Sequence, residues 1–220
     1  MDDQTKNVFD VVFTAIGLLG AAIGFAKAIH EWREGQRWKR SERLDRFVET
    51  FESTPLLKLA CTILDWTTRQ VKFDGRDVLI ENRDVLLALR NHAEEPAGTV
   101  FTGEQALIRD AYDAFLAFFA RLELAIATGL VEAEPAKSAF AYWLDQYATM
   151  KVHPGEAKLN KELRARSPAQ MAVVYLTAYG QPLLIGDLCE RFDVVLWSGK
   201  PKEARKKTTR TSDPTRTRAA

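Results

Sequence analysis

The stretch "TGEQALIRDAYDAFLAFFARLELAIATG", residues 102–129, decides the fold class of this chain. It opens with a capping box, Thr102-x-x-Gln105, whose two side chains satisfy backbone N–H groups at the start of a helix. It closes with Gly129, a residue type that readily ends a helix. Between them an apolar stripe recurs at helical spacing and is widened by neighbours: Ile108, Ala111, Tyr112, Phe115, Leu116, Phe118, Phe119, Leu122, Leu124 and Ile126. Such breadth predicts a central helix that is covered on several sides.

Further helices are expected on both sides of this stretch. Prolines at residues 55, 135, 168 and 182 each suit the first turn of a helix. The last of these helices is expected to run through "LLIGDLCERFDVVLW", residues 183–197. In "VKFDGRDVLI", residues 71–80, apolar residues alternate around Asp74-Gly75, which predicts a two-residue hairpin turn. The fold class is therefore mainly α, with a helical bundle over 54–198 and one small β-hairpin.

The N-terminal region changes from apolar to basic. No charge occurs from Val11 to Ala26, and the range 8–29 would span about 33 Å as a helix, enough for a bilayer core of about 30 Å. Basic residues follow this run, whereas "MDDQTKN" precedes it, which argues against a cleaved signal peptide. We therefore expect a short extracytoplasmic segment over 1–7, a transmembrane helix over 8–29 and a basic juxtamembrane helix over 30–53, with the body cytoplasmic. A buried helix of a soluble protein is the alternative.

Two features of this predicted helix point to its surroundings. Trp32 and Trp38 suit interfacial anchors at the level of lipid headgroups. Small residues gather in one arc of the helix and would let two backbones approach closely in lipid, and these are Gly17, Gly20, Ala21, Gly24 and Ala28. Two interpretations stay open, a self-associating face and a merely flexible anchor.

The C-terminal segment 199–220 is expected to be a disordered basic tail, since it contains no apolar residue larger than alanine. Its cations could bind anionic lipid of the inner leaflet, and those assigned to this role are Lys200, Lys202, Arg205, Lys206, Lys207 and Arg210. It has no aromatic residue to stack on bases, so nucleic acid is not an expected partner. A plain solubilising tail is the alternative.

Chemistry-bearing motifs are missing from the sequence. It has no P-loop, GxGxxG, GxSxG or HExxH pattern, so no cofactor, no metal and no catalytic residue is predicted. Cys61 and Cys189 sit in apolar helical patterns and are expected to be buried, reduced thiols. Glu123 is the exception, because it borders the apolar stripe between Phe119 and Ile126. A buried carboxylate needs a partner, which is either a structural arginine from another helix or the second group of a polar site.

The string "IRDAYDAFLAFFARLELAIATGLV", followed by "AFAYWLDQYA", resembles a pattern in uncharacterised bacterial proteins. Those proteins pair an N-terminal membrane helix with a small helical cytoplasmic domain. The residues that carry the resemblance are Arg121, Leu122, Glu123, Gly129, Tyr142, Trp143 and Leu144. It implies a protein of the bacterial inner membrane and supplies no activity.

Three functions are compatible with these features. The first is a single-pass membrane-anchored helical protein that acts as an interaction or regulatory module without catalysis. Its partners would be the lipid bilayer, an unknown protein and, through the small-residue face, a second copy of the chain. The second is a membrane-perturbing effector, of the kind used in phage defence, that oligomerises through its anchor. The third is an enzyme with a site around Glu123.

Overall fold

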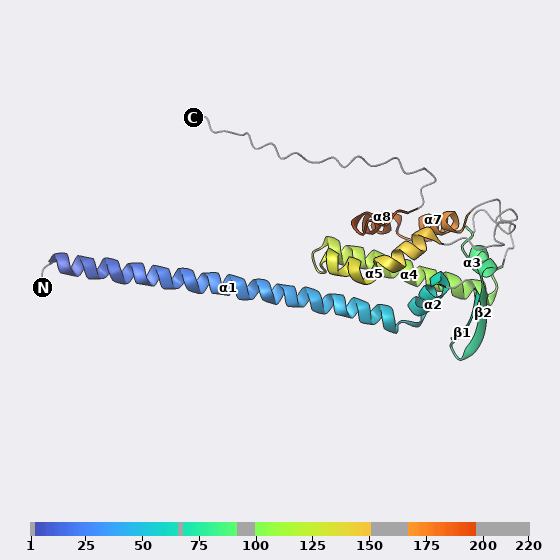
Figure 1. Cartoon of the computed structure of the whole chain (residues 1–220), viewed down its shortest axis with the longest axis horizontal. Coiled ribbons are helices and arrows are strands. Elements are labelled where there is room, and N and C mark those ends of the chain that lie inside the picture. Colours follow the sequence, from blue (N-terminus) through green and yellow to red (C-terminus); the bar gives the residue numbers. More distant parts are fainter. Residues whose placement is uncertain (1–2, 66–67, 92–99, 151–166, 197–220) are drawn as a thin grey trace, which may run out of the picture.

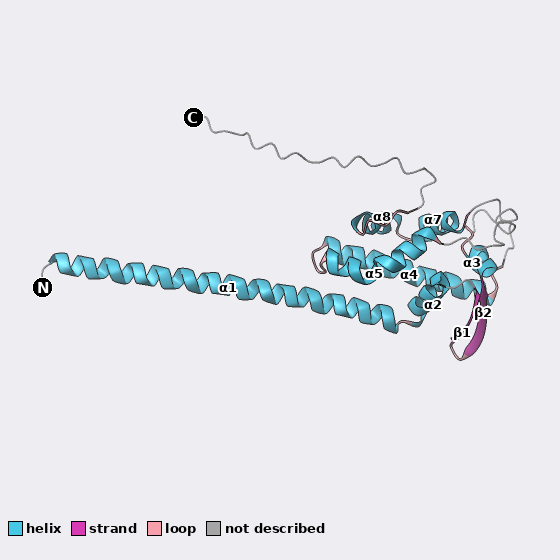
Figure 2. Cartoon of the chain, viewed as in Figure 1, coloured by secondary structure: helices cyan, strands magenta, loops and turns pink. Residues whose placement is uncertain are grey.

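The computed structural model describes residues 3–65, 68–91, 100–150 and 167–196, with side chains omitted for 3–17 and 68–69. In these ranges the chain forms seven helices and one two-stranded antiparallel sheet, which confirms the mainly α class with a small hairpin (Figures 1 and 2). The hairpin is coloured magenta in Figure 2 and lies at the end of the body that is far from the N-terminus.

Helix α1, Asp3–Ser53, is a single uninterrupted helix that extends far beyond the body (Figure 1). It passes through Gly35 without a break, although glycine weakens a helix interior. Only its last turns pack on the body, through the half-buried Leu44, Phe47 and Val48 and the buried Phe51. This apolar face, rather than helix propensity alone, fixes the helix on the body.

The transmembrane helix predicted over 8–29 is not supported by the structure. Across the described residues, no helix combines the length and the apolar character that a bilayer crossing requires. For residues 8–17 of that predicted span the structure describes the helix but not the side chains. From residue 18 to residue 29 every side chain is exposed.

Helix α4, Gly103–Ala127, is the central helix, as the sequence predicts. It packs against α2 (Pro55–Asp65), α3 (Asn82–Ala88) and α8 (Pro182–Arg191). Its capping box is formed, with Gln105 N donating to Thr102 Oγ1 at 3.3 Å. Its end is fixed by Gly129 at φ 71°, where the amide of Leu130 donates to the carbonyl of Ala125 at 2.8 Å. The helix is therefore defined by the hydrogen-bonded backbone groups at its two ends and by the buried apolar stripe between them.

The joint between α1 and the body is aromatic. Phe51 lies 5.0 Å from Phe118, 5.3 Å from Phe140 and 6.2 Å from Trp143, measured between ring centroids. Phe140 and Trp143 belong to helix α5, Ala133–Thr149, which begins two residues before the predicted start at Pro135. Offset and edge-on ring pairs of this kind add to the burial of apolar area. Phe51 thus joins the end of the long helix to α4 and α5, together with Phe47, whose ring centroid lies 5.7 Å from that of Phe118.

The hairpin has the predicted turn. Strand β1, Thr68–Phe73, pairs antiparallel with β2, Arg76–Glu81. Asp74 and Gly75 have φ values of 49° and 75°, the pair of positive values that a type I′ turn requires. Ile80 is buried and the apolar residues on the same face, Val71 and Val78, pack on the helical core. A hairpin too small to be stable alone is therefore supported by helices.

Of the two C-terminal helices, one has the predicted bounds and the other is shorter than predicted. Helix α7, Pro168–Tyr179, starts with a Ser167 capping box and ends before Gly180, as expected. Helix α8 stops at Arg191 instead of continuing to residue 197, so that prediction is wrong. Asp193 adopts φ 58° and the amide of Val194 donates back to the carbonyl of Cys189 at 2.8 Å. This helix-ending motif outweighs the apolar run that follows it.

Candidate functional site

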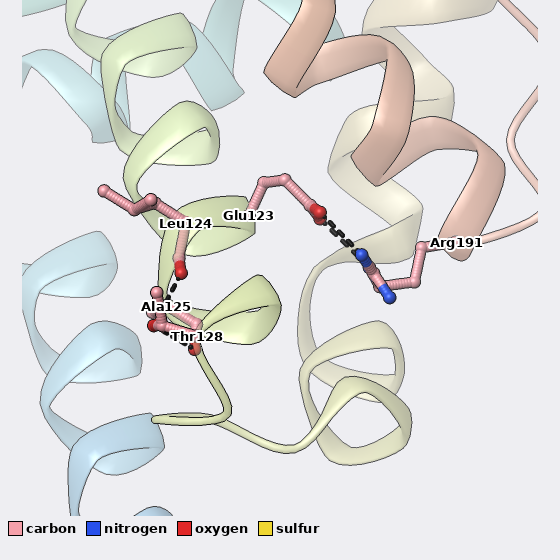
Figure 3. A network of polar contacts seen from close by, with 5 residues as sticks. All are labelled: Glu123, Leu124, Ala125, Thr128 and Arg191. Carbon is pink, nitrogen blue, oxygen red and sulfur yellow. Dashed lines mark hydrogen bonds and ion pairs between the residues drawn. The ribbon is translucent and has the colours of Figure 1, made fainter.

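Glu123 is a buried carboxylate, and its partner is Arg191 (Figure 3). Arg191 Nη2 donates to Glu123 Oε1 at 2.7 Å, and Arg191 Nε donates to Oε2 at 3.1 Å. The Glu123 side chain is 2% exposed and that of Arg191 is 38% exposed. Two parallel hydrogen bonds to a carboxylate form the strongest geometry available to arginine. The hydrogen bond to Glu123 raises the pKa of Arg191, which keeps the guanidinium charged.

Glu123 lies near the C-terminal end of α4, and its partner Arg191 is the last residue of α8. Thr128 Oγ1 donates to the carbonyls of Leu124 at 2.8 Å and Ala125 at 3.3 Å, one turn below the ion pair (Figure 3). Both carboxylate oxygens of Glu123 accept from Arg191, so a proton transfer by Glu123 would first require that pair to open. The arrangement connects α4 to the last turn of α8 and offers no second acid or base beside the carboxylate among the residues drawn in Figure 3.

A second ion pair lies on the surface, between α5 and the segment that follows α8. Lys137 Nζ donates to Asp193 Oδ2 at 2.6 Å, which ties the segment after α8 to α5. This hydrogen bond raises the pKa of Lys137 and lowers the pKa of Asp193. Asp193 is 84% exposed at its side chain, so water screens the pair and its contribution to stability is small.

Sequence reasoning missed a cluster around Arg109. The guanidinium carbon lies 4.7, 5.0 and 4.5 Å from the ring centroids of Phe101, Tyr175 and Tyr179. Its Nη1 donates to the carbonyl of Ala88 at 2.7 Å, at the end of α3. Cations at a helix C-terminus and over aromatic faces are both favourable. In the sequence, Tyr175 and Tyr179 are one helical turn apart on α7, but this spacing does not reveal an arginine beside their rings.

Three tyrosines are completely buried around α4. Tyr147 Oη donates to the carbonyl of Ala172 at 2.7 Å, and Tyr175 Oη donates to Asp113 Oδ1 at 2.6 Å. Tyr112 Oη has no hydrogen-bond partner among the described residues. Burial raises the pKa of all three phenols, and the same cause raises the pKa of Cys61 and of Cys189 to about 12. The two thiols are buried and free, as predicted, and remain protonated at neutral pH.

The residues assigned to the N-terminal helix lie apart from the body. Trp32 and Trp38 are 65% and 78% exposed. Gly20, Ala21, Gly24 and Ala28 are exposed, and a Cβ placed on Gly20 or Gly24 would meet nothing within 4 Å beyond the neighbouring residues and backbone of its own helix. The exposure of Gly17 is not described, and the tail cations at 200–210 lie outside the described residues. The described part of the chain brings no three metal-ligating side chains together.

Comparisons with protein-family models, with curated proteins and with solved structures find no match for this chain.

Proposed function

We propose that this chain is a single-pass membrane-anchored protein whose helical body acts as an interaction or regulatory module without catalytic activity. The observation that carries the proposal is the form of α1, one continuous helix whose first exposed stretch stands away from the body (Figure 1). Leu18, Leu19 and Phe25 are 68%, 67% and 69% exposed there. Large apolar side chains that are exposed to water indicate a surface that binds lipid or another protein.

The dimensions of α1 support this arrangement. A span over 8–29 would measure about 33 Å, and Trp32 and Trp38 would follow about 5 and 14 Å beyond it. Near the body, Arg40 Nη1 forms an ion pair with Glu132 Oε1, at 3.3 Å. Arg40 would lie about 16 Å past the end of the span, so the body would stand just below the headgroups. The basic tail would then lie near anionic lipid.

The body supports binding rather than chemistry. Its buried carboxylate, Glu123, accepts hydrogen bonds from two nitrogen atoms of Arg191, Nε and Nη2. The third alternative, an enzyme around Glu123, therefore has less support than an ion pair that fixes α8 on α4. A well-packed aromatic core joined to a continuous helix suits a module that binds other molecules through its body or through the helix.

The test is fractionation with two arginine substitutions in α1. Full-length protein should stay in the membrane pellet through alkaline carbonate extraction. Leu19→Arg combined with Ile23→Arg should release it, because each arginine at a span centre costs about 2.5–3.5 kcal/mol of insertion. Leu79→Arg is the matched control, since Leu79 is exposed on β2. Release of the unaltered chain by carbonate would refute the membrane anchor.

A further inference from the structure

A cavity of about 520 Å³ lies where α1, α2 and α5 meet, at the root of the long helix. This volume falls in the range of small-molecule pockets, about 300–1,000 Å³. Its lining combines apolar walls with a few polar groups, and the residues are Val48, Phe51, Glu52, Lys58, Cys61, Thr62, Ala139, Phe140 and Trp143. The ion pair of Glu123 and the cluster around Arg109 contribute nothing to this lining, so the cavity is a separate feature of the body.

The deep part of the cavity is aromatic. Phe51 and Phe140 are buried in the core, at 7% and 2% exposure, and their ring centroids lie 5.3 Å apart. Trp143 is half-buried beside them, 6.2 Å from Phe51. These rings are held by the core packing that fastens α1, so the apolar surface exists before any ligand arrives. A ring or a branched chain would fit such a surface and displace water from it.

The mouth of the cavity carries two opposite charges. Glu52 lies in the last turn of α1 and Lys58 in the first turn of α2, on either side of the one-residue connection at Thr54, and both side chains are exposed. Within the described ranges neither forms an ion pair, with the other or with a third group. A ligand with a single charge would face one like charge at this mouth, whereas a zwitterion would meet a complementary charge on each side. The Thr62 hydroxyl adds one neutral donor and acceptor.

We infer that this cavity binds a free α-amino acid with a large apolar side chain. The ammonium group lies toward Glu52, the carboxylate toward Lys58, and the side chain against Phe51, Phe140 and Trp143. The inference goes beyond the proposed function, because it gives the body a ligand class and does not depend on attachment to a membrane. It also places that ligand against α1 itself, the element that connects the body to the exposed stretch.

Calorimetric titration of the full chain in detergent tests the two charges separately. The probes are L-phenylalanine, N-acetyl-L-phenylalanine, which lacks the ammonium group, and L-phenylalaninamide, which lacks the carboxylate. Each derivative should bind at least about tenfold more weakly than phenylalanine, since a hydrogen bond to a charged group contributes about 1.5–3 kcal/mol and 1.4 kcal/mol is tenfold. Equal binding of all three, or no binding of phenylalanine, would overturn the inference.

Variants assign each charge to its residue. Lys58→Met should weaken phenylalanine binding at least about tenfold and abolish the difference between phenylalanine and its amide. Glu52→Gln should do the same for the N-acetyl derivative. Glu49→Gln and Lys72→Met are the matched controls, because Glu49 and Lys72 are exposed and do not line the cavity. Unaltered discrimination in both pocket variants would show that the ligand does not sit between these two charges.

A third variant tests the volume. Ala139 is exposed on the cavity wall, so Ala139→Phe can fill the cavity without disturbing the core. It should abolish binding while leaving the thermal unfolding of the chain unchanged. Phenylalanine binding that survives this substitution would place the ligand elsewhere and overturn the assignment.

Discussion

Replacing Arg191 with methionine should leave the Glu123 carboxylate buried without a partner. Removal of one member of a buried ion pair costs about 3–5 kcal/mol, because the remaining charge is desolvated and unpaired. Glu123 is 2% exposed but Arg191 is 38% exposed, so water reaches one side of the pair and lowers the cost. We therefore expect Arg191→Met to reduce the free energy of unfolding by about 2–3 kcal/mol. In a chain of this length that is a fall of roughly 4–12 °C in Tm.

The matched experiment removes both charges. Glu123→Leu combined with Arg191→Met has no buried charge, and apolar replacement of an ion pair is often neutral. This double variant should regain most of the lost stability, to within about 1 kcal/mol of the parent chain. Urea titration of the full chain in detergent, followed by circular dichroism, gives both values. A cost below about 1 kcal/mol for Arg191→Met, or a double variant as unstable as the single one, would refute a desolvated Glu123.

Four further expectations concern the hairpin, the core, the thiols and the exposed helix. Gly75→Val should reduce the free energy of unfolding by about 1 kcal/mol or more, because Gly75 has φ 75° and valine resists that conformation; a melting curve identical to the parent would contradict the type I′ turn. Tyr112→Phe should leave stability unchanged or raise it by about 1 kcal/mol, since the hydroxyl is buried without a partner among the described residues; a clear loss in urea titration would reveal a partner. Burial, with a smaller contribution from Asp65, raises the pKa of Cys61 from 9.0 to about 12, so its stabilising effect is complete below pH 9 and falls by about 1.4 kcal/mol per pH unit above that value; Cys61→Ala should make this part of the pH profile less steep and leave the similar contribution of Cys189, and an unchanged slope would contradict the burial of the Cys61 thiol. Gly24→Ile should reduce cysteine crosslinking between chains in membranes if the small-residue face pairs two copies, whereas Leu19→Ile should not; equal crosslinking would remove that face as an interface.

Much of the fold follows from local signals in the sequence. Thr102 and Gly129 limit α4 because they satisfy backbone groups that any helix leaves open at its ends. Asp74 and Gly75 define the hairpin for a similar local reason, the need for two positive φ values. Such features depend on neighbours in the chain, so a sequence can reveal them.

The remaining features depend on contacts between distant residues. The position of Glu123 beside the apolar stripe predicts burial, but its partner Arg191 is 68 residues away and could not be identified before the helices were packed. The apolar run after Asp193 suggested a longer α8, whereas the segment turns back there and pairs with Lys137. The cavity at the root of α1 is likewise invisible in the sequence, because three helices contribute to it.

The unbroken course of α1 determines how the body faces any partner of the exposed stretch. Because no loop or joint separates Gly24 from Phe51, the angle between the small-residue face and the body is set by the number of residues between them. Each residue inserted near Gly35 would rotate the body by about 100° about the helix axis and move it by about 1.5 Å. Seven inserted residues would restore nearly the original angle, since they complete about two turns. The number of residues in this segment therefore determines the direction in which the body faces relative to the small-residue face.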